Sequence, residues 1–327
     1  MTNAHATAPR FAAIDCGTNS IRLLIAEVLP DGGLNELNRD NIIVRLGQGV
    51  DATGRFADEA LERVDEALST YADRMVEYSV QDVMMGATSA TRDAANREEF
   101  FEISKRHLGR IRSGLSAEVI TGEREAELSF NGAVTDLGAL GDEERVCVID
   151  LGGGSTEFVV RTASGSVNES YSANMGCVRL TERYLHTQPP AVSEIAEAEA
   201  FVQQMMGDVQ EAVDLSAVDR VVGVAGTMTT MSSLTLGLTE YDPERNHMSE
   251  HSLEDFRATA RDLLARTTEQ RMELGPMHPG RADVIGGGAI VVDVFTTLFL
   301  EQGLKFITVS EKDILDGILA EVVRRNG

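Results

Sequence analysis

The chain has 327 residues, enough for about two domains that each bury an apolar core. Its 53 acidic and 29 basic residues give a formal net charge of −24, which repels nucleic acids and anionic membranes, so we expect neither as a partner. Three cysteines without a CxxC pair indicate no disulfide framework or structural zinc site, and the absence of a signal-like leader in MTNAHATAPR or of a long apolar run favours a cytoplasmic protein.

The first elements are predicted to be a three-strand meander and a helix. We expect strands over 11–16 and 21–28, a turn over 30–33 and a third strand over 41–46. Over 58–78, apolar residues recur at helical spacing and predict one buried helix face. These residues are Leu61, Val64, Leu68, Ala72 and Met75.

Strands and helices then alternate. The sequence predicts a strand over 80–87, one continuous helix over 89–109 with Ser89 or Thr91 as its N-cap, and a strand over 117–120. A further helix begins after Gly122, with one apolar face. That face contains Ala126, Phe130, Ala133 or Val134, and Leu137. This alternation predicts an α/β fold.

Two segments of the chain repeat one pattern. AAIDCGTNSIRLLIAEV and CVIDLGGGSTEFVVRTA each contain an apolar run, Ile-Asp-x-Gly, a small polar tip and a second apolar run, and their aspartates, Asp15 and Asp150, lie 135 residues apart. Symmetry on the length of a domain predicts two similar domains facing each other, with the cleft between them as the default site.

Two further glycine-rich segments lie at 221–231 and 283–295. Glycines there would let backbone amides approach a phosphate near the start of a helix. The commoner role of such residues is close packing, and this alternative applies to Gly223, Gly226 and Gly286 to Gly288.

Eight segments in order resemble the exopolyphosphatase and guanosine pentaphosphate phosphohydrolase family of the actin and sugar kinase superfold. They are IDCGTNS (14–20), VRLGQGVDATGRF (44–56), ATSATRDAAN (87–96), VITGEREAELSFNGAV (119–134), VIDLGGGSTEFV (148–159), MGCVRLTERYL (175–185), VAGTMTTM (224–231) and HPGRADVIGGGAIV (278–291). The resemblance implies two ribonuclease H-like domains with a cleft between them. It places them at 1–122, with a C-terminal helix over 311–325 packing back on this domain, and at 123–310.

The resemblance also implies metal-dependent hydrolysis of a terminal phosphoryl group from inorganic polyphosphate, from pppGpp or from both. This reaction needs a phosphate cradle, a divalent cation and a carboxylate that activates water. The two polar tips suit the cradle, with glycine backbone nests and side-chain donors. The predicted phosphate-binding residues are Gly17, Thr18, Asn19, Ser20, Gly152, Gly153, Gly154, Ser155 and Thr156.

Carboxylates near the tips suit Mg²⁺, which prefers oxygen ligands. Asp150 is the best candidate, with Glu157 nearby and Asp15 at the equivalent position of the first copy. Glu125, in GEREA, matches the family segment that carries the catalytic glutamate. The alternative is that Glu123 and Glu125 are acids of a first helical turn, which the helix dipole favours.

Arg92 matches a family arginine that faces the substrate phosphate, and its planar fork suits two phosphate oxygens. The alternative is an exposed helix arginine. Three further arginines, Arg22, Arg45 and Arg179, lie in matching segments and rank lower. Three histidines, His247, His251 and His278, are predicted to lie at the surface, and Cys16 is predicted to fill space in the core.

The chain departs from the family pattern near its C-terminus. It stops after one helix, which implies a short form that favours short polyphosphate chains. VSEKDILDGIL stands where the family has a Gly-Leu-Arg-acid-Gly run, so Lys312 either replaces that arginine or the contact is lost.

Several functions stay open at this point. The polyphosphate and pppGpp activities share every candidate residue. A guanosine tetraphosphate sensor without turnover would not need Glu125, Asp150 and Glu157, and a sugar or acetate kinase would need a nucleotide site in the segments 221–231 and 284–291. A homodimer is the commonest assembly and is expected here.

Overall fold

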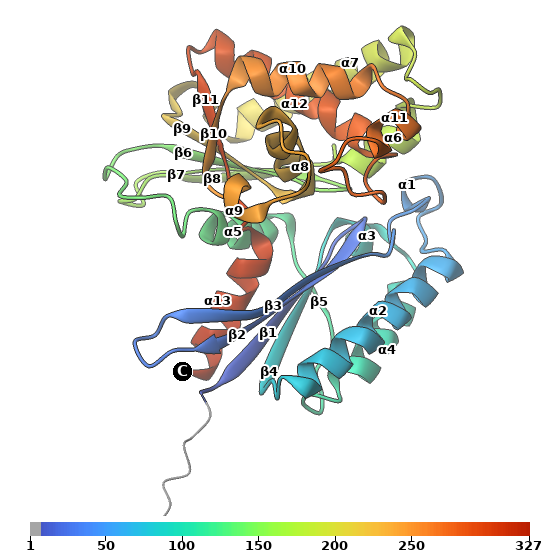
Figure 1. The fold of residues 1–327 in the computed structure, drawn as a ribbon, viewed down its shortest axis with the longest axis vertical. Helices are drawn as coiled ribbons and strands as arrows, with labels where there is room; N and C mark the ends of the chain where they lie inside the picture. The colour runs from blue at the N-terminus through green and yellow to red at the C-terminus, as the bar shows by residue number, and fades with distance from the viewer. Residues whose placement is uncertain (1–7) are drawn as a thin grey trace, which may run out of the picture. The chain divides into compact units, whose positions relative to one another are not determined.

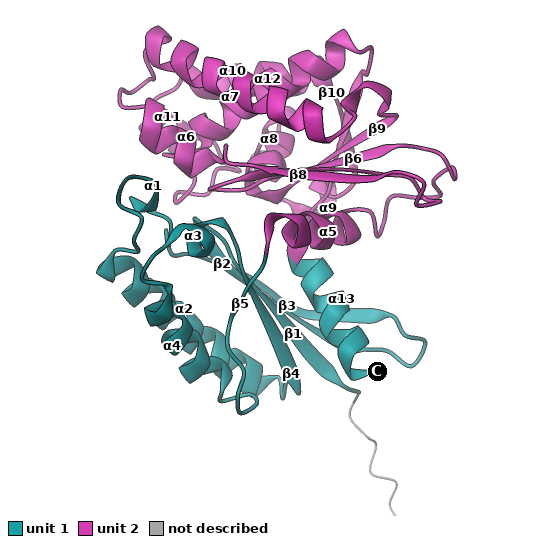
Figure 2. Cartoon of the chain, turned by 180° about the vertical axis from the view of Figure 1, so that it is seen from behind, with its two compact units in different colours: residues 1–120, 315–327 teal, residues 121–314 magenta. Residues whose placement is uncertain are grey.

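The computed structural model describes residues 8–327, so most of the leader discussed above lies outside the described residues. The chain divides into two compact units (Figures 1 and 2). Unit 1 contains the residues up to Ile120 together with Leu315–Gly327, and unit 2 contains Thr121–Ile314. Each unit is described by itself.

Unit 1 contains one mixed sheet in the strand order β3-β2-β1-β4-β5. The β1–β2 and β2–β3 pairs are antiparallel, and the β1–β4 and β4–β5 pairs are parallel. The elements are β1 (Arg10–Cys16), β2 (Ser20–Val28), β3 (Leu34–Ile43), α1 (Val50–Thr53), α2 (Asp58–Glu77), β4 (Asp82–Ala87), α3 (Ser89–Asp93), α4 (Arg97–Leu108), β5 (Glu118–Val119) and α13 (Ile314–Asn326).

Unit 2 contains a second mixed sheet, in the order β10-β11-β9-β6-β7-β8. Its elements are α5 (Gly122–Ala133), β6 (Val146–Leu151), β7 (Thr156–Arg161), β8 (Asn168–Ala173), α6 (Cys177–Tyr184), α7 (Val192–Ala212), the 3₁₀-helix η1 (Leu215–Ala217), β9 (Arg220–Val224), α8 (Ala225–Thr235), α9 (Pro243–Asn246), β10 (Ser249–Ser252), α10 (Leu253–Leu264), α11 (Thr268–Met272), α12 (Ile285–Glu301) and β11 (Phe306–Val309).

The two sheets share one topology. The order β8-β7-β6-β9-β11 in unit 2 repeats β3-β2-β1-β4-β5 of unit 1, with the same parallel and antiparallel pairs, and β10 adds an edge strand. This repeated arrangement is ribonuclease H-like. The predicted α/β fold with two such units is therefore confirmed, and the internal sequence repeat marks the first hairpin of each sheet.

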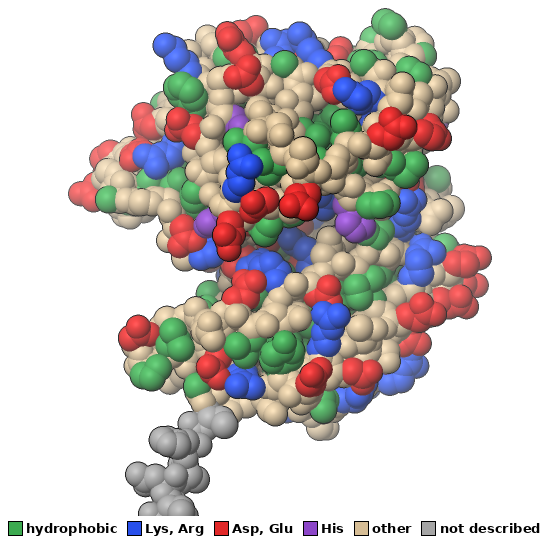
Figure 3. Space-filling model, viewed as in Figure 1, with side chains coloured by type: hydrophobic (Ala, Val, Ile, Leu, Met, Phe, Trp, Pro, Cys, Tyr) green, Lys and Arg blue, Asp and Glu red, His purple; other side chains and the backbone are tan. Residues whose placement is uncertain are grey.

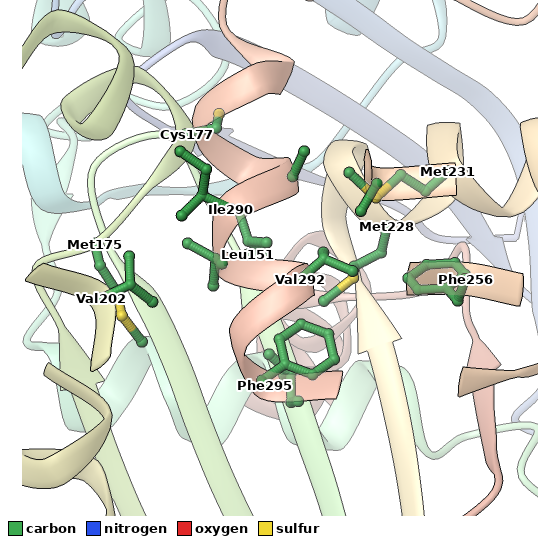
Figure 4. Packing of buried hydrophobic residues seen from close by; sticks show 14 of the residues in the cluster. Leu151, Met175, Cys177, Val202, Met228, Met231, Phe256, Ile290, Val292 and Phe295 are labelled. Carbon is green, nitrogen blue, oxygen red and sulfur yellow. The ribbon is translucent and has the colours of Figure 1, made fainter. Parts of the chain in front are cut away.

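Each unit has its own apolar core. In unit 1 the predicted face of α2 is buried against the sheet, and Tyr71 on the same helix donates a hydrogen bond to the Ile21 carbonyl at 2.8 Å. In unit 2 the apolar helix α12 packs among the neighbouring helices, as Figure 4 shows for Ile290, Val292 and Phe295. Burial of these side chains is the main favourable term for folding.

Two predicted elements were wrong in detail. The third strand lies over Leu34–Ile43 and not over 41–46. The helix predicted over 89–109 is broken between α3 and α4, because Asn96 uses its side chain to bind the backbone of Phe56, at 2.8 Å from its N–H and 3.2 Å from its carbonyl. Thr88 is the N-cap of α3.

The C-terminal helix begins at Ile314 rather than at residue 311. Within unit 1 its Ile318 side chain lies 3.0 Å from where a Cβ on Gly86 of β4 would be, so this glycine permits close packing. Near its end, Asn326 donates a hydrogen bond to Asp82 at 2.9 Å. These contacts hold α13 against the β4 side of the sheet.

Acidic and basic side chains both lie at the surface. On the face shown in Figure 3, acidic groups are spread among basic ones, in keeping with the net charge of −24. Within residues 8–327, none of the helices combines the length and apolar character that crossing a bilayer requires.

Candidate functional site

The two repeated hairpins end in the same kind of turn. In unit 1 the Gly17 N–H donates to the Ser20 carbonyl at 2.9 Å, and in unit 2 the Gly152 N–H donates to the Ser155 carbonyl at 3.0 Å. These two glycine amides therefore close the turns. The prediction that Gly17 and Gly152 offer their amides to a phosphate was wrong in this respect.

The segment 44–47 holds the unit 1 tip in place, because its backbone N–H groups donate to the carbonyl groups of the tip. The Thr18 carbonyl accepts from the Gly47 N–H at 2.8 Å, and the Asn19 carbonyl accepts from the N–H groups of Val44 and Arg45 at 3.0 and 2.8 Å. A Cβ on Gly47 would lie 2.2 Å from the Thr18 methyl group, so only glycine fits there.

The unit 2 tip is held in the same way, by the start of α6. The Gly152 carbonyl accepts from the Cys177 N–H at 3.0 Å, and the Gly153 carbonyl accepts from the Val178 N–H at 2.9 Å. A Cβ on Gly176 would lie 2.3 Å from the Gly153 carbonyl carbon and oxygen. This glycine allows α6 to dock on the tip.

Because the tip carbonyls are bound by these neighbouring segments, the N–H group that follows each carbonyl has a fixed direction. A trans peptide is planar, so its N–H points away from its C=O. The N–H groups of Asn19 in unit 1, and of Gly153 and Gly154 in unit 2, therefore point away from the segments that hold the tips. Amides oriented in this way form the kind of concave nest that binds oxyanions.

The side chains of the tips differ in their roles. Thr18 is 7% exposed, and its hydroxyl has no hydrogen-bond partner within residues 8–327. Thr156 is fully buried and donates its hydroxyl to the Met175 carbonyl at 2.8 Å. The prediction that Thr156 donates to a phosphate was therefore wrong, because its proton is already committed to the backbone.

Arg22 neutralises the carboxylate of the first hairpin. Asp15 and Arg22 are register partners, and the Arg22 Nε and Nη2 atoms both donate to Asp15 Oδ2, at 3.1 and 2.7 Å. A guanidinium in this position competes with a metal for the same oxygen. The pairing argues against Asp15 as a direct Mg²⁺ ligand.

The equivalent positions of the second hairpin hold two carboxylates. Asp150 and Glu157 are register partners in β6 and β7, and they are 6% and 1% exposed. Directly opposed side chains lie on the same face of a sheet with Cβ atoms about 4.5–5.5 Å apart. The hairpin therefore brings two buried acids together beside the Gly152–Gly154 tip.

Two serine hydroxyls fix these acids. Ser129 of α5 donates to Asp150 Oδ2, and Ser172 of β8 donates to Glu157 Oε1 at 2.7 Å. Ser172 also packs on the start of α5, because a Cβ on Gly122 would lie 2.6 Å from the Ser172 Cβ. Each carboxylate of the pair is thus connected to α5, Asp150 through Ser129 and Glu157 through Ser172.

Glu125 lies on the face of α5 that meets this pair. Thr121 is the N-cap and accepts from the Arg124 N–H at 3.2 Å, so α5 begins just before Glu125. Glu125 is 8% exposed, and it precedes Ser129 by about one helical turn, which places the two on the same side of the helix. Glu123 is exposed. Burial distinguishes Glu125 from an ordinary first-turn acid.

Arg92 is partly buried in unit 1 and donates through Nη1 to the Ile120 carbonyl at 3.0 Å. It is therefore not the exposed helix arginine of the alternative interpretation. Arg179 was ranked low from the sequence, yet its Nε donates to the Gly154 carbonyl at 2.8 Å and so supports the tip. Its segment, MGCVRL, was the only signal for this role.

One of the three histidines contradicts the surface prediction. His251 is 5% exposed and contacts the hydroxyls of Ser232 and Ser249 at 2.9 Å, whereas His278 is exposed. Burial lowers the pKa of His251. Cys16 is 1% exposed in the core, which confirms its filling role, and burial raises the pKa of its thiol.

The other glycine-rich segments serve packing. A Cβ on Gly287 would lie 2.4 Å from the Cys177 carbonyl oxygen, and one on Gly288 would lie 2.6 Å from the Thr227 methyl group. A Cβ on Gly226 would lie 2.3 Å from the Arg281 guanidinium. These glycines therefore allow close approach of backbone and side chains, which is the packing role.

The carboxylate pair of the unit 2 hairpin is the candidate metal site. Within residues 8–327, no group of three or more His, Cys, Asp or Glu side chains is arranged to hold a metal. The oxygen donors of Asp150 and Glu157 suit Mg²⁺, which commonly uses one or two carboxylates with water and phosphate oxygens.

Lys312 forms an ion pair with Asp136, which His247 also contacts at 2.9 Å.

Comparisons with known proteins agree with this architecture. A model of the Ppx/GppA phosphatase family matches residues 24–325. Exopolyphosphatase 2 of Mycobacterium tuberculosis is 50% identical over 313 residues, covering 94% of this chain and 97% of that protein.

Two solved structures are similar over nearly the whole chain. A crystal structure described as an exopolyphosphatase-like protein matches with a TM-score of 0.90 at 40% identity, covering 97% of this chain and 100% of that one. The Ppx/GppA family member of Aquifex aeolicus matches with a TM-score of 0.77 at 31% identity, covering 98% and 99%.

Proposed function

The chain belongs to the Ppx/GppA phosphatase family, and from this premise we propose that it is an exopolyphosphatase. In this proposal it hydrolyses the terminal phosphate of inorganic polyphosphate with Mg²⁺ and favours short chains. The observation that carries the proposal is the buried pair Asp150 and Glu157, beside the amides of Gly153 and Gly154. The mycobacterial relative, whose name is exopolyphosphatase 2, supports the choice of substrate.

Each residue has a defined role in this reaction. Glu125 accepts a proton from a water molecule, and the oxygen of that water attacks the terminal phosphorus. The bridging P–O bond then breaks, and orthophosphate and a shortened chain are released. Asp150 and Glu157 would hold Mg²⁺, which neutralises charge on the phosphate oxygens. Gly153 and Gly154 donate backbone hydrogen bonds to those oxygens.

The unit 1 residues bind phosphate in the same proposal. The Asn19 amide and the Arg92 guanidinium supply donors, and the fork of Arg92 suits two oxygens of one phosphoryl group. Ser20 and Ser155 remain predicted phosphate-binding residues at the ends of the two turns. A cytoplasmic location and a homodimer remain predictions from composition and from the commonness of such assemblies.

The decisive experiment compares substrates at fixed Mg²⁺ concentration. Phosphate release is measured from short polyphosphate, long polyphosphate and pppGpp, and binding of guanosine tetraphosphate is measured in parallel. We expect short polyphosphate to have the highest kcat/KM, and a chelator to abolish release. Preferential cleavage of pppGpp, or tight tetraphosphate binding without any release, would replace the proposal with one of those two alternatives.

A further inference from the structure

A cavity lies within unit 1, and it is lined by residues of α1, of the start of α2 and of the neighbouring segments. Figure 1 shows where these two helices lie in the ribbon. Its volume is about 660 Å³, and its wall includes Gln48, Arg55, Glu59 and Arg63. Small-molecule sites have volumes of about 300–1,000 Å³. The cavity is therefore large enough for a ligand bigger than a single orthophosphate, and none of the residues in its wall has a role in the proposed hydrolysis.

The charge of the wall favours an anion. The wall contains two guanidinium groups, those of Arg55 and Arg63, and one carboxylate, that of Glu59. Because the whole chain carries a net charge of −24, an anion would have to be captured by a local group of this kind.

The hydrogen-bond partners of Arg63 are neutral groups, so they do not offset its positive charge. Its Nε donates to the Val44 carbonyl at 2.7 Å, and its Nη2 contacts the Gln48 side-chain oxygen at 3.3 Å. Within residues 8–327, no carboxylate forms an ion pair with it. Arg55 is 60% exposed, and its closest acid is Glu99 at 3.9 Å, which is longer than a hydrogen bond.

We propose that this cavity binds a short inorganic phosphate chain of two or three phosphoryl groups, separately from the hydrolytic site. Guanidinium forks bind phosphate oxygens in pairs, and the wall supplies the fork of Arg55 and the Nη1–Nη2 fork of Arg63, whose Nε already donates to Val44. A chain of linked phosphoryl groups can engage both forks at once. The ligand is either a free short polyphosphate or the distal end of a longer substrate.

The cavity is connected to the phosphate-binding tip. Arg63 binds the Val44 carbonyl, and the Val44 N–H in turn donates to the Asn19 carbonyl at 3.0 Å. The segment that contributes Gln48 to the cavity also contains Gly47, whose N–H donates to the Thr18 carbonyl. A ligand on Arg63 therefore acts on the segment that orients the tip.

Calorimetry with tripolyphosphate tests the site directly. The full-length Glu125→Gln protein is titrated with tripolyphosphate, and we expect two binding events. Arg55→Gln should weaken one of them by about tenfold to a hundredfold, because a hydrogen bond to a charged group is lost. Arg97→Gln is the matched control, since Arg97 is an exposed arginine of the same unit that does not line the cavity.

The outcomes separate the two ligand sources. A KM that rises in Arg55→Gln for long polyphosphate but not for tripolyphosphate indicates the distal end of the substrate. An unchanged KM for both substrates, together with the weakened binding event in the titration of Arg55→Gln, indicates a separate ligand. The absence of any binding event that Arg55→Gln weakens, or equal behaviour of the Arg55 and Arg97 variants, would overturn the proposal, whereas a single event that Arg55→Gln weakens would count against the hydrolytic site alone. Because calorimetry requires no turnover, this result is independent of whether the chain releases phosphate.

Discussion

Glu157 lies directly opposite Asp150 in the hairpin of β6 and β7, and both carboxylates are buried. In the matching hairpin of unit 1, Arg22 lies opposite Asp15 and neutralises it. One repeated backbone therefore holds an acid pair in one unit and an ion pair in the other. This difference assigns the proposed Mg²⁺ to the unit 2 hairpin.

If the acid pair holds Mg²⁺, removing one of its charges should raise the Mg²⁺ concentration that activity requires. Glu157→Gln keeps the shape of the side chain but removes one negative charge from the pair, so the Mg²⁺ concentration for half-maximal phosphate release should rise at least about tenfold. The measurement is a Mg²⁺ titration of activity. Glu250→Gln, on the exposed side of the edge strand β10, is the control and should leave the titration unchanged.

Ser172 is predicted to position Glu157 for this role. Ser172→Ala removes the hydroxyl that donates to Glu157 at 2.7 Å. Loss of an outer hydrogen bond of this kind typically costs about 10–100-fold in metal affinity or activity. The Mg²⁺ titration and the thermal unfolding of the variant are measured together. A drop in stability without any change in the Mg²⁺ titration would leave Ser172 with a structural role alone.

Gly176 is predicted to be essential for the geometry of the unit 2 tip. Gly176→Ala places a Cβ 2.3 Å from the Gly153 carbonyl, so the backbone must move, and overpacking of this kind costs about 1–3 kcal/mol. We expect lower stability in urea unfolding and a higher KM. In contrast, Gly207→Ala lies in the exposed middle of α7 with open space around it and should stabilise the fold by about 0.5–1 kcal/mol.

Asp136 predicts a pH dependence of stability. The hydrogen bond from Lys312, with that from His247, holds the pKa of Asp136 below its ordinary value of 3.8. Because the folded pKa is lower than the unfolded one, this stabilisation is present above 3.8 and is lost as the pH falls through the folded pKa.

Unfolding of Asp136→Asn at two pH values checks this sign. The variant should be less stable than the parent at neutral pH, and the difference should shrink once the pH falls below the ordinary aspartate pKa of 3.8 and through the lower folded pKa. Asp208→Asn, at an exposed position of α7, is the control. A difference that is the same at both pH values would show that the ion pair does not contribute.

The three cysteines should be unreactive in the folded protein. Cys16, Cys147 and Cys177 are buried, and burial raises the pKa of each thiol. The thiolate is the reactive form, so a colourimetric thiol reagent should modify them only after denaturation. Rapid modification of the native protein would mean that one of the cores opens readily.

The sequence was sufficient for the two Ile-Asp-x-Gly hairpins and for α2, because strand alternation and helical spacing are local properties. It could not show that Asn96 would break a helix by binding Phe56, since that contact joins distant residues. In the same way, Ile-Asp-x-Gly locates both aspartates, but only the strand register pairs Asp15 with Arg22.

The orientation of the two hairpin tips could not be predicted from the sequence either. The turns were correctly placed, but the glycines that dock them, Gly47 and Gly176, lie in other segments and act by allowing close approach. Thr156 was misassigned because its partner, the Met175 carbonyl, becomes adjacent only when β7 and β8 pair.

The most direct test of the account is the turnover of two variants on one helix. Glu125→Gln and Glu123→Gln each remove one acid from the first turn of α5, but only Glu125 is buried, on the side of the helix that carries Ser129, the partner of Asp150. We predict that Glu125→Gln lowers kcat for polyphosphate by about 10²–10⁴-fold with unchanged thermal stability, while Glu123→Gln keeps its activity. Equal turnover in the two variants would contradict the account.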